Sequence, residues 1–340
     1  MKRVMFVTNS LSGGGAERAM NLASNELCRR NWAIALIPIN DSPPDYIDPI
    51  SEVFPLGRKW RGGIVDTVLS YIRFNRIVLS WKPDVVVVTC DLPEFFGAFL
   101  LAKKRLVIVE EASFPWGTRE VFGRTIRKLL EIRGAKTVAA SPHLQIWPHR
   151  HSADVVIQNA ITPFQTDKVS KTKMRGPVRL NFIGRLSLEK RPNWLIEVCE
   201  SSGFKGRIIG DGGMKQSLID SASMKAIDIE FTGFLKDPWA SLEEEELLIV
   251  PSVFEGDGLV VIEAMKKGVP LLLSDIPDFR RFELPEKHYC ADVTAFASRA
   301  LEYSNKLEEL VVPPDISSKI FFSRTPSSIG DKWEEFLNSI

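Results

Sequence analysis

The chain is poor in several features that would define other classes of protein. It has only 4 cysteines in 340 residues, and Cys28, Cys90, Cys199 and Cys290 lie far apart, with no CxxC pair. A disulfide framework and a cysteine metal site are therefore not expected, and a reducing compartment fits. No apolar run approaches the roughly 20 residues of a membrane-spanning helix. No signal peptide precedes the first predicted strand, so we expect a cytoplasmic protein.

Common nucleotide and metal motifs are also missing. There is no GxGxxG fingerprint and no P-loop GK[ST] sequence, which argues against a dinucleotide or ATP site. No Asp-x-Asp pair follows a suitable strand. His143, His149 and His151 are close in sequence, but no Asp, Glu or Cys accompanies them at ligand spacing. We therefore expect no metal site.

The overall charge is nearly balanced but unevenly distributed. A formal net charge of +1 argues against nucleic-acid binding. Residues 1–160, however, hold 21 Lys and Arg against 15 Asp and Glu. This excess suggests an anionic partner for the N-terminal half, such as a phosphorylated acceptor or a membrane surface.

One predicted helix, 121–132, bears on that choice. Basic residues surround its apolar positions, a pattern typical of helices that lie on anionic membranes. An ordinary surface helix explains the same pattern, and both alternatives remain open. The basic residues in and beside it are Arg124, Arg127, Lys128 and Arg133, and further basic clusters lie at 58–61 and 103–105.

The most informative stretch is residues 247–274. Apolar runs over 247–250 and 269–273 predict two buried strands, with a helix over 259–267 between them. The loop Glu255-Gly256-Asp257-Gly258 brings backbone N–H groups to the helix N-terminus, where an anion binds well. With Glu263 in the helix, this unit offers two carboxylates to a polyhydroxylated ligand. Two solvated glutamates beside a glycine turn would show the same spacing.

Other predicted strands end in glycine turns or cations. The first strand, 3–8, is followed by Gly14 and Gly15 at a helix N-terminus. The strand 178–183 is followed by Arg185 and Lys190, which can hold an anion with a planar fork and a point charge. Gly212 and Phe234 follow two later strands, and Glu111 follows the strand 106–109. The acidic run 243–246 is expected to face solvent.

The alternation of strands and helices predicts an α/β protein with two doubly wound, Rossmann-like domains. The first domain covers residues 1–160 and the second covers 178–325. The polar segment 161–177 is expected to link them.

Several of these segments together resemble one family. The stretch PSVFEGDGLVVIEAMKKGVPLLLSD is similar to the donor-site signature of retaining GT-B glycosyltransferases of the family 4 type (glycosyl transferases group 1). Only the loop aromatic differs, since Asp257 stands in its place. GGGAER, FIGRLSLEK and GDGG are similar to the family's N-terminal glycine loop, pyrophosphate motif and G-D-G-P turn. Relatives often have a His where this chain has Glu111.

The resemblance implies a GT-B fold with two domains facing across a cleft, and a last helix, about 326–340, that packs back on the first domain. It implies catalytic roles for Glu255, Arg185, Lys190 and Glu111. The donor is expected to contact these residues: Gly14, Gly15, Arg185, Lys190, Gly212, Phe234, Gly256, Asp257, Gly258, Leu259 and Glu263.

The implied reaction moves a sugar, with retention, from a nucleoside-diphosphate sugar, with UDP favoured, to a hydroxyl of a glycan or lipid-linked acceptor. Surface-polysaccharide biosynthesis is the expected context. No cofactor and no metal are expected, because Arg and Lys can stabilise the leaving pyrophosphate. Contact with the inner face of an anionic membrane stays open. So do two other functions on the same fold, a UDP-sugar 2-epimerase and a non-catalytic nucleotide-sugar-binding protein.

Overall fold

The protein is described here from a computed structural model, in which the described residues are 2–12, 14–41, 51–60, 62–112, 116–161, 178–242 and 246–340. The predicted linker lies outside them, apart from Ile161. The chain divides into two compact units, which are described separately. Unit 1 comprises Met1–Pro163 together with Ser323–Ile340, and unit 2 comprises Phe164–Phe322.

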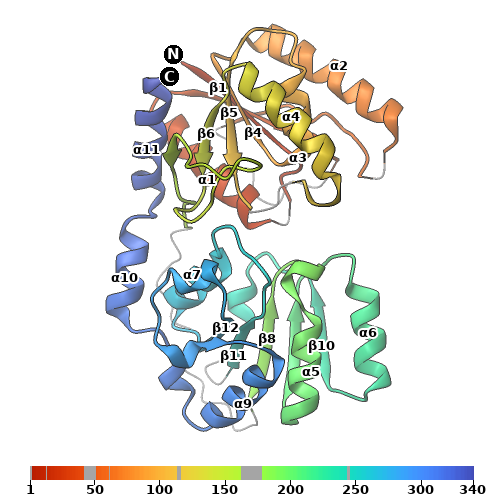
Figure 1. Ribbon diagram of the computed structural model, residues 1–340, viewed down its shortest axis with the longest axis vertical. Helices are drawn as coiled ribbons and strands as arrows, with labels where there is room; N and C mark the ends of the chain where they lie inside the picture. Colours follow the sequence, from red (N-terminus) through yellow and green to blue (C-terminus); the bar gives the residue numbers. More distant parts are fainter. Residues whose placement is uncertain are drawn as a thin grey trace. The chain divides into compact units, whose positions relative to one another are not determined.

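Unit 1 is a parallel sheet with helices on both faces (Figure 1). The strand order is β3-β2-β1-β4-β5-β6-β7. The strands are β1 (Arg3–Thr8), β2 (Ala33–Pro38), β3 (Glu52–Val53), β4 (Val85–Thr89), β5 (Arg105–Glu110), β6 (Lys136–Ala139) and β7 (Val155–Val156). Their apolar side chains are buried on both faces, as expected for a parallel sheet covered by helices.

The helices of unit 1 cover the sheet in two groups, each with its own apolar core. One group comprises α1 (Gly15–Arg29) and α11 (Pro326–Ser339). The other comprises α2 (Ile64–Trp81), α3 (Asp91–Ala98) and α4 (Glu120–Ile132). The last helix is fixed to unit 1 by Trp333, whose ring meets Phe6 edge-on at 5.7 Å, and by the ion pair between Arg30 and Glu334 at 3.2 Å.

Unit 2 repeats the architecture with the strand order β10-β9-β8-β11-β12-β13. Its strands are β8 (Arg179–Ile183), β9 (Lys205–Ile209), β10 (Ile229–Gly233), β11 (Glu246–Val250), β12 (Leu271–Ser274) and β13 (Tyr289–Cys290). Its helices are α5 (Asn193–Ser202), α6 (Lys215–Met224), α7 (Leu259–Lys267), α8 (Pro277–Arg280), α9 (Val293–Tyr303) and α10 (Pro314–Phe322). The predicted pair of doubly wound parallel sheets is confirmed.

Helix α3 begins at Asp91, and Pro93 lies in its first turn, where no backbone N–H is needed. Two local expectations were wrong. Glu246 is fully buried in β11 rather than facing solvent, and its Oε2 lies 3.1 Å from Nη1 of Arg207. Arg127 points into unit 1 and not outward from α4. Among the described helices, none is both long and apolar enough to cross a membrane.

Candidate functional site

The strand order of unit 2 reverses between β8 and β11, which are hydrogen-bonded in parallel. Open α/β sheets bind ligands at such a switch point, beyond the carboxyl ends of the strands. The loop after β8 carries Arg185 and Lys190, and the loop after β11 carries Glu255 to Gly258. The topology therefore places the two predicted donor loops side by side.

Lys190 and Glu255 are in direct contact across these loops. The Lys190 Nζ lies 2.6 Å from Oε2 of Glu255, and the Ser252 hydroxyl donates to Oε1 at 2.7 Å. The loops are also joined through the backbone, because the N–H of Val253 donates to the Glu189 carbonyl at 2.7 Å. Glu255 is buried, whereas the Lys190 side chain is 27% exposed, so that its ammonium can reach a ligand as well as Glu255.

Arg185 is exposed, and within the described part of unit 2 its guanidinium forms no ion pair. A planar guanidinium in this position is suited to bidentate recognition of a phosphate. The structure thus combines one cation that is held by Glu255 with one that is directed to solvent.

The glycine loop leads directly into α7. Gly258 has φ +58° and precedes Leu259, the first residue of the helix. The first N–H groups of a helix have no acceptor within it, so they are available to an anion. Gly258 packs against Phe279 and Phe282, which a Cβ there would meet at 3.4 and 3.5 Å. Contact of this helix N-terminus with phosphate remains a prediction.

Asp257, the departure from the family pattern, is explained by a partner that is distant in sequence. Arg281 donates to its backbone carbonyl at 2.6 Å, and Nη2 of Arg281 lies 3.2 Å from Oδ1 of the Asp257 carboxylate. Asp278 accepts from the N–H of Glu255 at 2.7 Å. The Asp257 side chain is only 2% exposed, so it points into unit 2. Its ion pair with Arg281 anchors the loop there. Any donor contact here would come from its backbone.

Glu263 lies in the second turn of α7 and is buried. The indole N–H of Trp239 donates to its Oε2 at 2.9 Å. Trp239, which the sequence did not single out, thus orients the Glu263 carboxylate, which is predicted to contact the donor. Phe234 follows β10 and is 42% exposed, so that its ring is accessible for stacking on a base.

Gly210 and Gly212, in the loop after β9, pack closely against the backbone of the loop after β8. A Cβ on Gly210 would lie 1.9 Å from the Gly184 carbonyl oxygen, and one on Gly212 would lie 2.5 Å from that of Leu186. These glycines allow the loop after β9 to support the backbone that carries Arg185. Direct contact of Gly212 with the donor remains a prediction.

We expect Gly210→Ala to weaken nucleotide binding about tenfold, or about 1.4 kcal/mol, because the clash with Gly184 displaces the Arg185 loop. Gly213→Ala is the matched control, since a Cβ there meets nothing within 4 Å. Calorimetric titration with UDP, together with melting temperatures, measures both. Equal affinities in the two variants would contradict this role of the loop.

In unit 1, the predicted glycine loop forms the N-terminus of α1. Gly14 is the N-cap and Gly15 the first helical residue. A Cβ on Gly14 would meet the Glu17 carboxylate at 1.6 Å, so this helix end already faces one negative charge. An anion that binds here must therefore move Glu17 aside.

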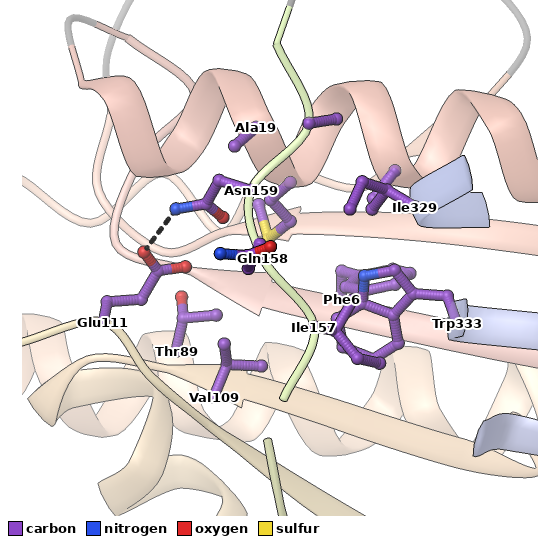
Figure 2. Close-up of a pocket in the computed structure, with 13 residues that line it drawn as sticks. Phe6, Ala19, Thr89, Val109, Glu111, Ile157, Gln158, Asn159, Ile329 and Trp333 are labelled. Atoms are coloured by element: carbon purple, nitrogen blue, oxygen red, sulfur yellow. Dashed lines mark hydrogen bonds between the residues drawn. The ribbon is translucent and has the colours of Figure 1, made fainter. Parts of the chain in front are cut away.

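A small pocket lies at the carboxyl end of the sheet of unit 1 (Figure 2). Glu111 and Asn159 point toward one another there, with Nδ2 of Asn159 donating to Oε2 of Glu111 at 3.5 Å. Thr89 and Gln158 add polar groups, while apolar side chains including Trp333 form the opposite wall. Glu111 therefore takes part in a mixed polar and apolar pocket at a strand end, although no basic group is among the residues that line it.

On the other face of the sheet, beside α3 and α4, unit 1 contains a buried ionic cluster that the sequence did not reveal. Arg127 binds both oxygens of Glu94 at 2.6 Å and Oε2 of Glu110 at 3.0 Å. Burial raises the pKa of Glu94 to about 7, although Arg127 acts in the opposite direction. Because Glu110 immediately precedes Glu111, the cluster also holds the strand end that carries Glu111.

Within the described ranges, no group of three His, Cys, Asp or Glu side chains is placed to hold a metal ion. The cations that face the donor loops are instead Arg185 and Lys190. Metal independence remains a prediction for experiment.

Comparisons with known proteins bear on both units. The model of the family Glycosyl transferases group 1 matches residues 164–310, which lie in unit 2. The chain is 21% identical to the amylovoran biosynthesis glycosyltransferase AmsD of Erwinia amylovora, over 99% of each chain.

Solved structures cover the whole chain. A variant of S. aureus TarM, in complex with Fondaparinux, alpha-GlcNAc-glycerol and UDP, matches with a TM-score of 0.77 and 14% identity, over 99% of this chain and 100% of that one. Anabaena HepE in complex with UDP and glucose matches with a TM-score of 0.76 and 15% identity, over 100% of each chain. The GT-B fold is confirmed, and the matches support the expectation of a hexosyltransferase enzyme.

Proposed function

We propose that this protein is a retaining glycosyltransferase that moves a hexosyl group from a UDP-sugar to a hydroxyl of a glycan or lipid-linked acceptor in surface-polysaccharide biosynthesis. The observation that carries the proposal is the contact between Lys190 and Glu255 at the switch point of unit 2, beside the N-terminus of α7. The amylovoran relative and the UDP complexes of TarM and HepE support the pathway and the nucleotide.

The residues of unit 2 are suited to holding the leaving group. Negative charge grows on the pyrophosphate as its bond to the sugar breaks, so cations and N–H groups fixed around it lower the barrier. Arg185, Lys190 and the first N–H groups of α7 would supply this stabilisation without a metal. Glu263 would accept from the ribose hydroxyls and Phe234 would contact the base.

The sugar itself would be held by carboxylates. Both oxygens of Glu255 already have partners, and their remaining lone pairs can accept from sugar hydroxyls. We propose that Glu111 contacts the transferred sugar in the position where relatives often have His. For retention we favour attack on the face that the leaving group departs from. The acceptor oxygen forms its bond to the anomeric carbon as the phosphate oxygen leaves, and that phosphate takes the acceptor proton.

Calorimetric titration with UDP, GDP and ADP in the presence of EDTA tests the donor site. We expect UDP to bind selectively and EDTA to have no effect, because protein cations replace the metal. Slow release of UDP from UDP-glucose, UDP-galactose or UDP-N-acetylglucosamine would then identify the sugar. If none of the diphosphates binds, a non-catalytic role becomes the better account, and if EDTA abolishes binding, metal independence is wrong.

A further inference from the structure

Helix α2 of unit 1 is apolar on two opposite sides. Its inner side, which includes Phe74 and Val78, is buried in the core against the sheet. Its outer side carries large apolar residues that are 42% to 74% exposed. We call this set the outer face of α2: Val65, Val68, Leu69, Ile72 and Leu79.

These residues form a stripe and are not scattered. Their spacing of three, four and seven residues places them on one side of the helix, opposite the buried positions. The only charged residues on α2 are Asp66, Arg73 and Arg76, and Arg76 lies on the stripe itself. A surface helix is ordinarily polar on its outer side, so a continuous apolar stripe marks an interaction surface.

Exposed apolar side chains also lie beyond α2, which is the orange helix in Figure 1. Trp60 and Ile64 at its N-terminal end are 58% and 84% exposed. On its flank, the N–H of Leu101 donates to the Asn75 side chain at 3.0 Å, which holds the 73% exposed Leu101 beside the helix. The exposed apolar area thus extends past a single helix.

Positive charge surrounds this surface. Five exposed cations lie on α2, at its ends or beside it, and none forms an ion pair with a described residue: Lys59, Arg73, Arg76, Lys82 and Lys103. On α4 the situation differs, because Arg124 and Lys128 pair with Glu120 and Glu131, and Arg127 is buried. The cations on α4 itself are thus paired or buried, whereas those on α2 and at its ends are exposed.

We propose that the outer face of α2 lies on the surface of an anionic lipid bilayer, with the apolar stripe at the acyl boundary and the surrounding cations at the headgroups. Binding of this kind grows with apolar area and with each Lys or Arg near the surface. A second copy of this chain fits less well, since it would bring the same set of cations to the contact, whereas an anionic lipid surface compensates them. The proposal does not rest on the donor site.

The test is co-sedimentation with vesicles of phosphatidylglycerol and phosphatidylethanolamine, compared with vesicles of phosphatidylcholine. The unaltered protein is expected to bind the anionic vesicles, and less so as salt rises. The double variant Val68→Glu/Ile72→Glu is expected to partition more than about tenfold less, because two charges enter the apolar boundary. The matched control is Met224→Glu/Leu301→Glu, which alters exposed apolar residues of unit 2 and is expected to bind normally.

A milder variant keeps the test decisive if the double variant folds poorly. Arg76→Gln leaves the stripe intact and removes one cation, so we expect about fivefold weaker binding, or about 1 kcal/mol. UDP titration of each variant should be unchanged, which separates this proposal from that of the donor site. Absence of vesicle binding by the unaltered protein, or equal losses in the control, would overturn the proposal. So would light scattering that shows a lipid-free dimer abolished by Val68→Glu/Ile72→Glu, since the face would then join two copies.

Discussion

Lys190→Ala is expected to weaken UDP binding by about 10- to 100-fold and to lower turnover by about 100- to 1,000-fold. The binding loss reflects a charge-assisted contact with the pyrophosphate, and the larger loss in turnover reflects the charge that develops as the bond breaks. The geometry adds a second cause. Lys190 also neutralises Glu255 at 2.6 Å, so that its removal leaves a carboxylate beside the bound phosphates.

That second cause can be separated from the first. In Lys190→Ala/Glu255→Gln the uncovered carboxylate is gone, so UDP should bind more tightly than to Lys190→Ala alone. Turnover should stay low, because both side chains are proposed to act on the donor. Calorimetry and the UDP-release assay measure the two effects.

Lys205→Ala is the control for charge. Lys205 is exposed in the same unit, and its Nζ pairs with Asp228 at 2.8 Å. It begins β9, at the strand end remote from the donor loops, and an exposed ion pair contributes only about 0–1 kcal/mol. If this variant lost as much affinity as Lys190→Ala, the specific role of Lys190 would be wrong.

Much of unit 2 could be predicted because the sequence signals for it are local. Apolar runs of strand length, a glycine loop and the helix that follows lie within residues 247–274, and α7 has the predicted bounds. The cation pair after β8 is equally local. The side chains that lie at these loops could therefore be named without knowledge of the tertiary structure.

What could not be predicted depends on partners distant in sequence. Asp257 looks like a substitution in a ligand loop until Arg281 is found beside it. Glu246 looks like part of a solvated acidic run, yet Arg207 from β9, on the other side of β8, compensates its burial. In α2, only packing shows which of the apolar residues are left outside the core.

Arg127 is the clearest of these cases, and its replacement has the largest expected effect on stability. Arg127→Met is expected to lower the free energy of unfolding by about 3–5 kcal/mol, the range for breaking one side of a buried ion pair. Two carboxylates, Glu94 and Glu110, would be left in the core of unit 1 without their cation. Arg124→Met on the same helix is the control. Its ion pair with Glu120 is half exposed, and we expect a loss below about 1 kcal/mol.

The loss of unfolding free energy in Arg127→Met should be larger at high pH than at low pH, because burial disfavours the charged form of Glu94. In the folded protein burial raises the pKa of Glu94 to about 7, above the ordinary value of 4.5. The stability linked to this proton is fully present below about pH 4.5 and is lost as the pH rises toward 7. Without Arg127 the main opposition to burial is gone and only hydrogen bonds from Trp116 and Trp147 remain. The variant should therefore be least stable near pH 8 and recover part of the loss near about pH 5.5.

Urea unfolding followed by tryptophan fluorescence at the two pH values measures this difference, because Trp116 and Trp147 both contact the cluster. Glu94→Gln/Arg127→Met should show a weaker pH dependence, since one of the two buried acids is then permanently neutral. The same loss at both pH values would mean that the cluster acts only through packing. A pH-dependent loss would show that the charge balance of the cluster stabilises the core of unit 1 next to the strand end that carries Glu111.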